Sequence, residues 1–304
     1  MKLTNVKGNT WVLEGSQLLG LYRLDETRCV LLDSGSGKVR QDLAETLAAA
    51  GLTPVGVICT HMHYDHHENT RWLRETYGTE TCLPQIEAEI VRSVESLKNH
   101  LFNFTAGMIR TIPRLQNLLC PVDQVIGPEE TSVHLGGADF TVLRTPGHAP
   151  DHICVITPDN VCFAGDVLMT EDILKDAMVP FVFDMTDDLA SKEKLKGVSC
   201  DAWIFSHAGV VYGDITSLID ANLTREKQQL TACVALTDRP MTYSAWYAKV
   251  IVAFSLPVGH PIRALHLERY LRPYLEYLID RGELVLLEVD GAAMVAPKGW
   301  KDHA

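Results

Sequence analysis

The chain has 304 residues, of which 46% are hydrophobic and 22% are charged. This length and composition are typical of a folded globular protein with a large core, and they exclude a disordered chain. With 27 Lys and Arg against 39 Asp and Glu, the formal net charge is −12. Because nucleic-acid-binding surfaces need clustered basic side chains, we do not expect nucleic acid as a partner.

The sequence also lacks the signals of a membrane or secreted protein. No run of residues approaches the ~18 apolar side chains that a spanning helix needs, and Met1 to Gly20 do not have the pattern of a signal peptide. Eight cysteines are scattered without a C-x-x-C pair, which is typical of reduced, buried thiols. We therefore expect a cytoplasmic protein with no membrane partner.

Short apolar and β-branched runs bounded by Gly, Pro or Asp dominate the first two thirds of the chain. They predict strands at Thr10–Leu13, Cys29–Leu32, Val55–Thr60, Phe140–Arg144, His152–Thr157, Val161–Ala164 and Ala202–Ser206. Helical patterns at Val39–Ala50 and Glu68–Tyr77 lie between some of these strands, and a glycine follows each helix. Strands interleaved with helices indicate a layered protein of the α/β (α+β) class.

Residues 84–119 depart from this rhythm. Apolar side chains such as Ile86, Ile90, Val94 and Leu97 recur at helical spacing, so the segment predicts two long amphipathic helices. Ordinary packing helices are one interpretation. The other is a lid over a site, because long insertions between motif-bearing elements are often functional.

The pattern changes again near residue 215, where three helices and a hairpin follow one another. The helices are expected at Leu218–Leu236, Thr242–Phe254 and Ala264–Arg281, and the hairpin turns at Asp290-Gly291. This order is that of a winged helix, but residues 215–304 carry ten basic and ten acidic side chains. We therefore expect a role in packing or in covering a substrate instead of DNA reading, and we divide the chain into domains 1–214 and 215–304.

The most informative segment is Thr60-His61-Met62-His63-Tyr64-Asp65-His66-His67, directly after a predicted strand. His61 and His63 are two residues apart, so an extended backbone presents both imidazoles on one side. There they can occupy two corners of a tetrahedral cation such as Zn²⁺. Asp65 and His66 can reach a metal together only after a turn, and we expect them to face a second ion.

Three further candidates lie just beyond other predicted strands. His148, Asp166 and His207 each follow the carboxyl end of such a strand, where loops from different strands can converge. A single histidine at such a position is more often a hydrogen-bonded polar residue than a ligand. The whole set, in its strand-then-loop context, favours a metal site.

These residues resemble the metallo-β-lactamase superfamily, whose signature is His-x-His-x-Asp-His. The similarity covers residues 10–215 and includes Asp33-Ser34-Gly35, the Thr145-Pro146-Gly147-His148 loop and Gly165-Asp166. It implies a four-layer αββα sandwich with two metals at one edge. The tail resembles the subset of the superfamily in which the sandwich carries a small helical, winged-helix-like C-terminal domain.

The resemblance also implies a role for each candidate. The first metal would be held by His61, His63 and His148, the second by Asp65, His66 and His207, and both by a bridging Asp166. Asp33 would accept a hydrogen bond from a ligand histidine, although turn chemistry before Ser-Gly explains this aspartate equally well. His67 and His152 are not expected to be ligands, because the seven positions already fill a two-metal site.

Such a site predicts a hydrolase. Two divalent cations, two carboxylates and a bridging hydroxide leave a net charge of roughly +1, which stabilises a developing oxyanion without a nucleophilic side chain. We therefore predict a metal-dependent hydrolase that uses the metal-bridging hydroxide on a small-molecule ester, thioester or lactone, with Asp65 relaying a proton. The ligand set favours zinc, with iron and manganese as alternatives.

Two other functions stay open: a metal-dependent nuclease or phosphodiesterase, and a sulfur-dioxygenase-like oxidoreductase with one iron. Substrate specificity is expected from residues 84–119, the Leu168–Met185 loop and the tail. Trp246, Tyr243 and Phe181 are candidate pocket aromatics, although aromatic residues in such helices usually belong to the core. The sequence leaves a homo-oligomer open.

Overall fold

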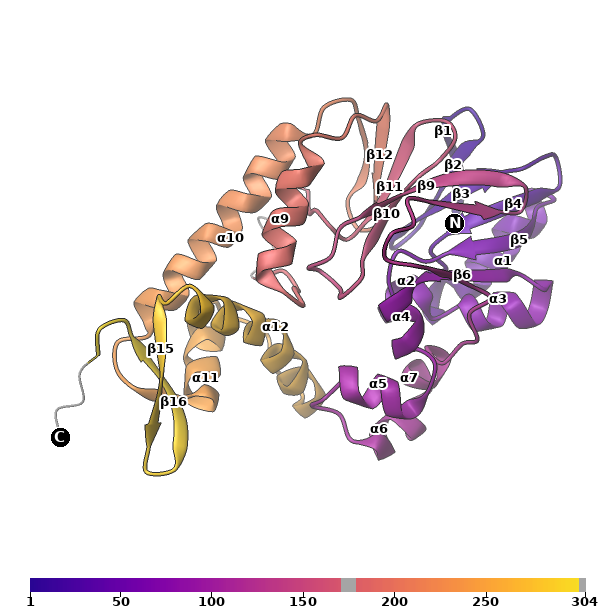
Figure 1. The fold of residues 1–304 in the computed structure, drawn as a ribbon. Helices are drawn as coiled ribbons and strands as arrows, with labels where there is room; N and C mark the ends of the chain where they lie inside the picture. Colours follow the sequence, from indigo (N-terminus) through magenta and orange to yellow (C-terminus); the bar gives the residue numbers. More distant parts are fainter. Residues whose placement is uncertain (171–178, 301–304) are drawn as a thin grey trace.

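The computed structural model describes residues 1–170 and 179–300, and two β-sheets dominate this part of the chain (Figure 1). The first sheet contains β1 (Lys2–Lys7), β2 (Thr10–Glu14), β3 (Leu18–Arg23), β4 (Arg28–Leu32), β5 (Thr53–Ile58), β6 (Glu80–Pro84) and β7 (Gln124–Ile126), in that order. The second contains β13 (Gly209–Tyr212), β12 (Ala202–Phe205), β11 (Val161–Gly165), β10 (Ile153–Ile156), β9 (Ala138–Arg144) and β8 (Ser132–Leu135), in that order. All the strands expected from the sequence are present.

Helices cover the outer face of each sheet. On the first sheet, α1 (Arg40–Ala49, preceded by the short helix Gly37–Val39) and α3 (Thr70–Tyr77) bury Leu43 and Leu73 against strand side chains. On the second sheet, α9 (Met185–Leu195) and the first half of α10 (Thr216–Leu236) do the same. The inner faces of the two sheets meet in a third apolar cluster that contains Phe140 and Phe163. These layers form the predicted αββα sandwich.

The prediction of two long helices over residues 84–119 was wrong. The structure instead has four short helices, α4 (Gln85–Ile90), α5 (Val94–His100), α6 (Ala106–Thr111) and α7 (Pro113–Asn117). The side chains of Ser93 and Thr105 cap the starts of α5 and α6 by accepting backbone N–H bonds. Pro113 forces Ile112 into an extended conformation and so separates α6 from α7.

The tail has the predicted order of elements. After α10 come β14 (Met241–Thr242), α11 (Tyr243–Ala253), α12 (Pro261–Asp280), β15 (Leu284–Val289) and β16 (Ala292–Pro297). Their apolar side chains form a cluster of their own, in which Trp246 is fully buried and donates its indole N–H to Thr237 Oγ1 at 2.9 Å. Trp246 therefore belongs to a core and not to a pocket. Because α10 contributes to this cluster and to the sandwich, it connects the two parts.

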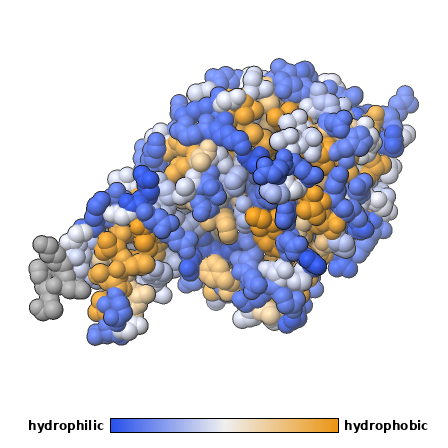
Figure 2. Space-filling model, in the orientation of Figure 1, coloured by the Kyte–Doolittle hydropathy of each residue, from blue (hydrophilic) through white to orange (hydrophobic). Residues whose placement is uncertain are grey.

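Figure 2 shows a mainly hydrophilic surface, with one apolar group over the C-terminal hairpin and others over the sandwich. Leu286 of β15 and Val252 of α11 are among the exposed large apolar residues. All eight cysteines are free and buried, as expected. Within residues 1–170 and 179–300, no helix combines the length and the apolar character that crossing a bilayer requires.

Candidate metal centre

The His-rich segment leaves the end of β5 and turns into the short helix α2 (Tyr64–His67). His63 stands immediately before this helix with extended backbone angles, φ −59° and ψ 148°. Asp65 and His66 lie in this helical turn, which is the turn that the sequence analysis required for both side chains to reach one metal. Ser34 fixes the turn because its backbone N–H donates to the carbonyl of His66 at 2.7 Å.

Two glycines allow the other loops to approach closely. Gly147 has φ +126°, and a Cβ at this position would collide with the backbone of Asp188. Gly165 has φ +53°, and a Cβ there would lie 2.6 Å from His152 Nε2. Glycine fits these left-handed conformations without strain. The neighbouring side chains, His148 and Asp166, are thereby placed beside the His-rich segment.

Three histidines form the first group of ligand atoms. His61 Nε2 lies 2.9 Å from His63 Nδ1, which lies 3.0 Å from His148 Nε2. These three residues belong to one set whose ligand atoms are all within 4.8 Å of one another. Burial lowers the pKa of His61 and His63 well below the usual value, so both rings are neutral.

In His61 and His148, the hydrogen bonds of the ring nitrogen that faces away from this group determine which nitrogen carries the proton. His148 Nδ1 donates to the carbonyl oxygen of Phe181 at 3.0 Å, so its Nε2 carries a lone pair. Thr60 Oγ1 donates to Asp33 and is thus free to accept from His61 Nδ1 at 2.9 Å. We infer that His61 Nε2 is also unprotonated. Two bare nitrogens therefore face His63 Nδ1, an arrangement that a cation between them would stabilise.

The second group combines carboxylates and imidazoles. Asp65 Oδ2 lies 3.2 Å from His207 Nε2, and Asp166 Oδ2 lies 3.2 Å from His66 Nε2. The four residues form a second set with ligand atoms within 4.8 Å of one another. Burial opposes ionisation of Asp166, but the imidazoles of His66 and His207 outweigh it and hold the pKa of this carboxyl well below its usual range.

Asp166 connects the two groups. Its Oδ2 is 3.6 Å from His148 Nε2 in the first group, besides its contact with His66 in the second. Its Oδ1 is buried and has no hydrogen-bond partner among the described residues. A buried carboxylate oxygen without a partner is costly, and a cation would satisfy it. The residues therefore fit a pair of divalent metal ions, and the structure brings all seven predicted ligands together.

Residues outside the two groups hold the ligands in place. Asp33 Oδ2 accepts a 2.6 Å hydrogen bond from His66 Nδ1, which directs His66 Nε2 toward Asp166 and the second group. His152 is buried, and its Nε2 accepts the backbone N–H of Asp166 at 3.3 Å. His67 is buried against Cys59, with Nδ1 3.4 Å from the sulfur. Neither His67 nor His152 belongs to the two ligand sets.

Glu87 is a functional candidate that the sequence analysis missed. This buried residue of α4 accepts the backbone N–H of Met62 on one oxygen and that of Asp151 on the other, both at 3.0 Å. One carboxylate thus ties the loop of His61 to the loop of His148. No sequence signal could reveal it, because both of its partners are backbone groups.

The metal-ligand residues open into a cavity of about 460 Å³, within the size range of small-molecule sites. Its floor includes His63, Asp65, His148 and Asp166. Phe181, predicted as a pocket aromatic, lies in its wall, with its ring 4.9 Å from that of His63. Part of the Leu168–Met185 loop, residues 171–178, lies outside the described residues.

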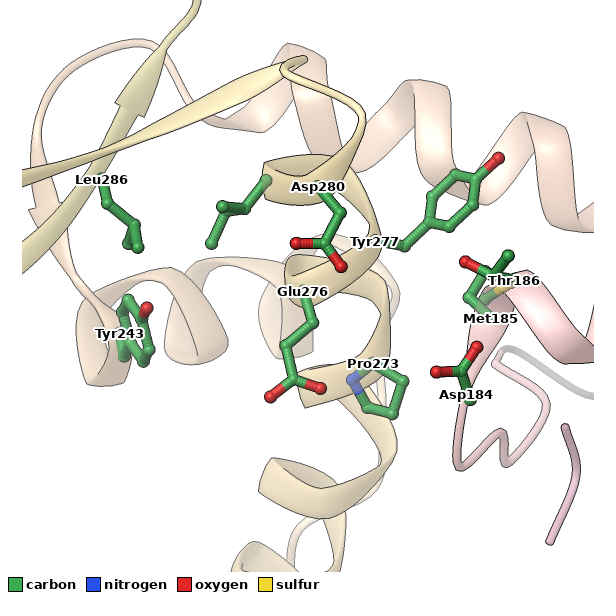
Figure 3. Close-up of a pocket in the computed structure, with 10 residues that line it drawn as sticks. Asp184, Met185, Thr186, Tyr243, Pro273, Glu276, Tyr277, Asp280 and Leu286 are labelled. Carbon is green, nitrogen blue, oxygen red and sulfur yellow. The ribbon is translucent and has the colours of Figure 1, made fainter. Parts of the chain in front are cut away.

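A separate hollow of about 340 Å³ lies between the start of α9, α11, α12 and β15 (Figure 3). Tyr243 lines it, and Asp184, Glu276 and Asp280 give it an acidic character. It contains none of the predicted ligands. The chemistry therefore belongs to the larger cavity beside α2.

The sequence profile of the metallo-beta-lactamase superfamily matches residues 8–207, which is more than half of the chain. The chain belongs to the metallo-beta-lactamase superfamily. The matched segment includes strands β2 to β12 and all seven predicted ligands.

Curated members of the superfamily are similar at low identity. A hydroxyacylglutathione hydrolase of Shewanella halifaxensis is 26% identical over 162 residues, covering 53% of this chain and 47% of the relative. An atrochrysone carboxyl ACP thioesterase of Passalora fulva is 22% identical over 264 residues, covering 84% of this chain and 68% of the relative. The chain thus spans about half the length of the first relative.

Solved structures of the superfamily share the fold over nearly the whole chain. A metallo-beta-lactamase family protein of Thermus thermophilus superposes with a TM-score of 0.71 at 20% identity, covering 92% of this chain and 93% of that one. A beta-lactamase domain protein of Burkholderia ambifaria gives the same TM-score at 19% identity, covering 97% and 93%. At such identities the likeness concerns the fold, including the tail.

Proposed function

We propose that this superfamily member is a metal-dependent hydrolase acting on a small-molecule ester, thioester or lactone. The observation that carries the proposal is the position of Asp166 between two groups of ligand atoms at the floor of a cavity. The names of two relatives, a hydroxyacylglutathione hydrolase and an ACP thioesterase, support the choice of an acyl substrate.

A pair of divalent cations, for which we propose zinc, supplies Lewis acidity and makes water more acidic at neutral pH. His61, His63 and His148 would hold one cation, Asp65, His66 and His207 the other, and Asp166 both. Asp65 is partly exposed to the cavity, with 22% of its side chain accessible. It can therefore accept a proton from an entering water molecule.

The reaction then needs one proton to move. The oxygen of the water forms a bond to the acyl carbon, and the bond from that carbon to sulfur or oxygen breaks. The proton held by Asp65 passes to the departing thiolate or alkoxide, so the products are a carboxylic acid and a thiol or alcohol. We propose a cytoplasmic location and a small-molecule partner, with no nucleic acid or membrane involved.

The test combines metal analysis with a substrate panel. Purified protein is assayed by elemental analysis and then against a thioester, an aryl ester, a lactone, a phosphodiester and a persulfide. We expect about two metal ions per chain and turnover of an acyl substrate that is lost in His61→Ala. His134→Ala is the matched control, since His134 is exposed and its side chain pairs with Asp139, away from both ligand sets.

Other results would contradict the proposal. One iron per chain with oxygen uptake on the persulfide would favour the oxidoreductase. Cleavage of the phosphodiester alone would favour a nuclease or phosphodiesterase. Acyl turnover that His61→Ala leaves intact would show that the metal centre is not the site of reaction.

A further inference from the structure

Helix α12 of the tail forms one wall of the cavity beside the metal centre. Arg263, His266, Arg269 and Tyr270 all line the cavity, and their spacing of three to four residues places them on one face of the helix. The N-terminal half of α12 is held there by the 84–119 segment. Asn103 Nδ2 donates to the Leu265 carbonyl at 3.0 Å.

Phe181 connects this wall to the ligands. Its ring lies 4.9 Å from that of His63 on one side and 4.7 Å from that of Tyr270 on the other. The guanidinium of Arg269 lies 5.4 Å from the same ring. The Phe181 ring therefore contacts both the Arg269 guanidinium and the imidazole of His63, a residue of the first group of ligands.

Within the part of the chain that the structure describes, Arg263 and Arg269 have no anionic partner. Among the described residues, neither Arg263 nor Arg269 forms an ion pair: Arg263 lies 5.5 Å from the Tyr270 ring, and Arg269 donates to His100 Nε2 at 2.9 Å. Burial lowers the pKa of Arg269 to about 10, so its side chain is still charged at neutral pH. By contrast, Arg272 on the same helix pairs with Glu276 at 2.7 Å.

A half-buried guanidinium without a counter-ion is unfavourable, and a bound oxyanion would relieve that cost through charge-assisted hydrogen bonds. A third cation, Arg114 of α7, also lines the cavity. Its ion pair with Glu68 is long, with 3.9 Å between Arg114 Nε and Glu68 Oε2. This concentration of positive charge stands out in a chain with a net charge of −12. It contrasts with the acidic hollow on the other part of α12 (Figure 3).

Part of the cavity lining is apolar. Leu101, Leu115 and Leu118 of the 84–119 segment belong to this part, and apolar side chains of this kind favour a hydrocarbon group. The cavity thus offers both apolar and cationic side chains beside the metal-ligand residues. A ligand that fits both kinds of side chain is amphipathic.

We propose, on the basis of the hydrolase function above, that the substrate is an acyl thioester or ester bearing an oxyanion that Arg263 and Arg269 bind. Its apolar part lies against Leu101, Leu115 and Leu118. The oxyanion is a carboxylate or a phosphate, which share the geometry that a guanidinium recognises. The tail therefore contributes directly to substrate choice.

Matched hexanoyl thioesters test the proposal. The leaving thiols are 3-mercaptopropionate, its neutral methyl ester, and 2-mercaptoethyl phosphate, so the carboxylate and phosphate arms are separate. We expect kcat/KM to be at least ~10-fold higher for one of the anionic thioesters than for the neutral one. In Arg263→Gln/Arg269→Gln, kcat/KM for that anionic thioester falls at least ~10-fold, mainly through KM, to the level of the neutral one, as expected for loss of charge-assisted bonds.

Two controls isolate the arginines. Arg281→Gln removes the same charge from the exposed end of α12 and should leave the preference unchanged. Arg263→Lys/Arg269→Lys retains the charge without the guanidinium geometry and should keep part of the preference that the Gln variant loses, which distinguishes lost binding from lost folding. Equal kcat/KM for neutral and anionic thioesters in the wild type, or equal losses for both in the Gln variant, would overturn the proposal.

A binding measurement separates this proposal from the hydrolase function. Non-hydrolysable thioethers with the same anionic and neutral ends are titrated into the wild type and the Gln variant by calorimetry. Arginine-dependent binding of the anionic thioether without turnover of any thioester, ester or lactone would support the oxyanion site and contradict the hydrolase. Thioester turnover with equal binding of both thioethers would support the hydrolase and contradict the oxyanion site. If the protein shows no turnover and no binding, both proposals are contradicted.

Discussion

Glu87 Oε2 accepts a 3.0 Å hydrogen bond from the backbone N–H of Met62, the residue between His61 and His63. The other oxygen of the same carboxylate accepts the N–H of Asp151, three residues after His148. One buried side chain of the 84–119 segment thus sets the spacing between the two loops that supply the first group of ligands.

Glu87→Gln tests this tie. A glutamine amide can accept only one of the two N–H bonds, and its NH₂ group would face the other donor. Groups that orient metal ligands typically contribute 10- to 100-fold to metal affinity, so we expect a loss of roughly that size. The measurement is a competition titration with a chromogenic chelator.

Glu89→Gln is the matched control for this prediction. Glu89 lies on the same helix but is exposed and pairs with Arg92 at 3.2 Å. We expect it to leave the metal affinity unchanged. Wild-type affinity in Glu87→Gln as well would mean that the two loops hold their spacing without the carboxylate.

Asp33→Asn is expected to weaken the second group of ligands. Asp33 accepts the 2.6 Å bond from His66 Nδ1 and also bonds Thr60, which in turn bonds His61. A neutral amide binds an imidazole N–H less strongly than a carboxylate does, so metal affinity should fall by roughly 10- to 100-fold. Calorimetric titration of metal-free protein measures the stoichiometry and the affinity.

Asp25→Asn provides the control, because Asp25 accepts its bonds in an exposed turn far along the chain from the ligands. It should bind metal as the wild type does. If Asp33→Asn also does so, the role of Asp33 is limited to the turn chemistry that its sequence context suggests.

Metal removal is expected to lower the melting temperature. Without a cation, His61 and His148 direct lone pairs at His63, and Asp166 keeps an unpaired oxygen. At a free metal concentration about 1,000 times Kd, binding contributes about 4 kcal/mol. At roughly 2 °C per kcal/mol for a chain of this size, chelation should lower the melting temperature by about 8 °C.

Scanning calorimetry before and after dialysis against a chelator measures this shift. Re-addition of zinc, iron or manganese identifies the metal that restores it. His61→Ala, which lacks one ligand atom, should show a smaller shift. An unchanged melting temperature in the wild type after complete metal loss would contradict a folded site that depends on the cations.

The sequence could predict the strands and the seven ligands because both are encoded locally. His61 and His63 are close in the chain, and His148, Asp166 and His207 each follow a recognisable strand. The lengths of the helices in 84–119 could not be read from apolar spacing, because capping by Ser93 and the restraint imposed by Pro113 divide them.

The substrate-facing residues were harder to predict for a different reason. Arg263 and Arg269 lie about two hundred residues from the His-rich segment and reach the cavity only because α12 packs against residues 100–104. Nothing in the local sequence of α12 distinguishes these arginines from solvated ones. Glu87 was likewise hidden because it is recognised only by its backbone partners.

A buried charge cluster lies between α9 and α10. Lys192 forms ion pairs with Asp188 and with Glu226, and all three side chains are almost completely buried. Lys192→Met would leave the buried side chains of Asp188 and Glu226 without their cationic partner. We expect the free energy of unfolding to fall by roughly 3–5 kcal/mol.

Lys196→Met is the matched control on the same helix. Lys196 also pairs with two carboxylates, those of Glu193 and Asp220, each at 2.8 Å, but these carboxylates are exposed. Because exposed pairs contribute about 0–1 kcal/mol, its effect should be small. Urea unfolding compares the two variants, and equal effects would mean that burial does not strengthen the Lys192 pairs.

The same cluster predicts a pH dependence. Burial raises the pKa of Glu226 from 4.5 to about 8, against the opposing effect of Lys192. The folded chain therefore binds this proton more tightly than the unfolded chain. The stabilisation that the proton gives to the folded state is complete below pH 4.5 and is lost as the pH rises through 8. Glu226→Gln removes the titrating group, and its unfolding midpoint should fall less than that of the wild type between about pH 6 and pH 9. Parallel decreases in the two proteins would show that Glu226 is already ionised at the lower pH and is held so by Lys192.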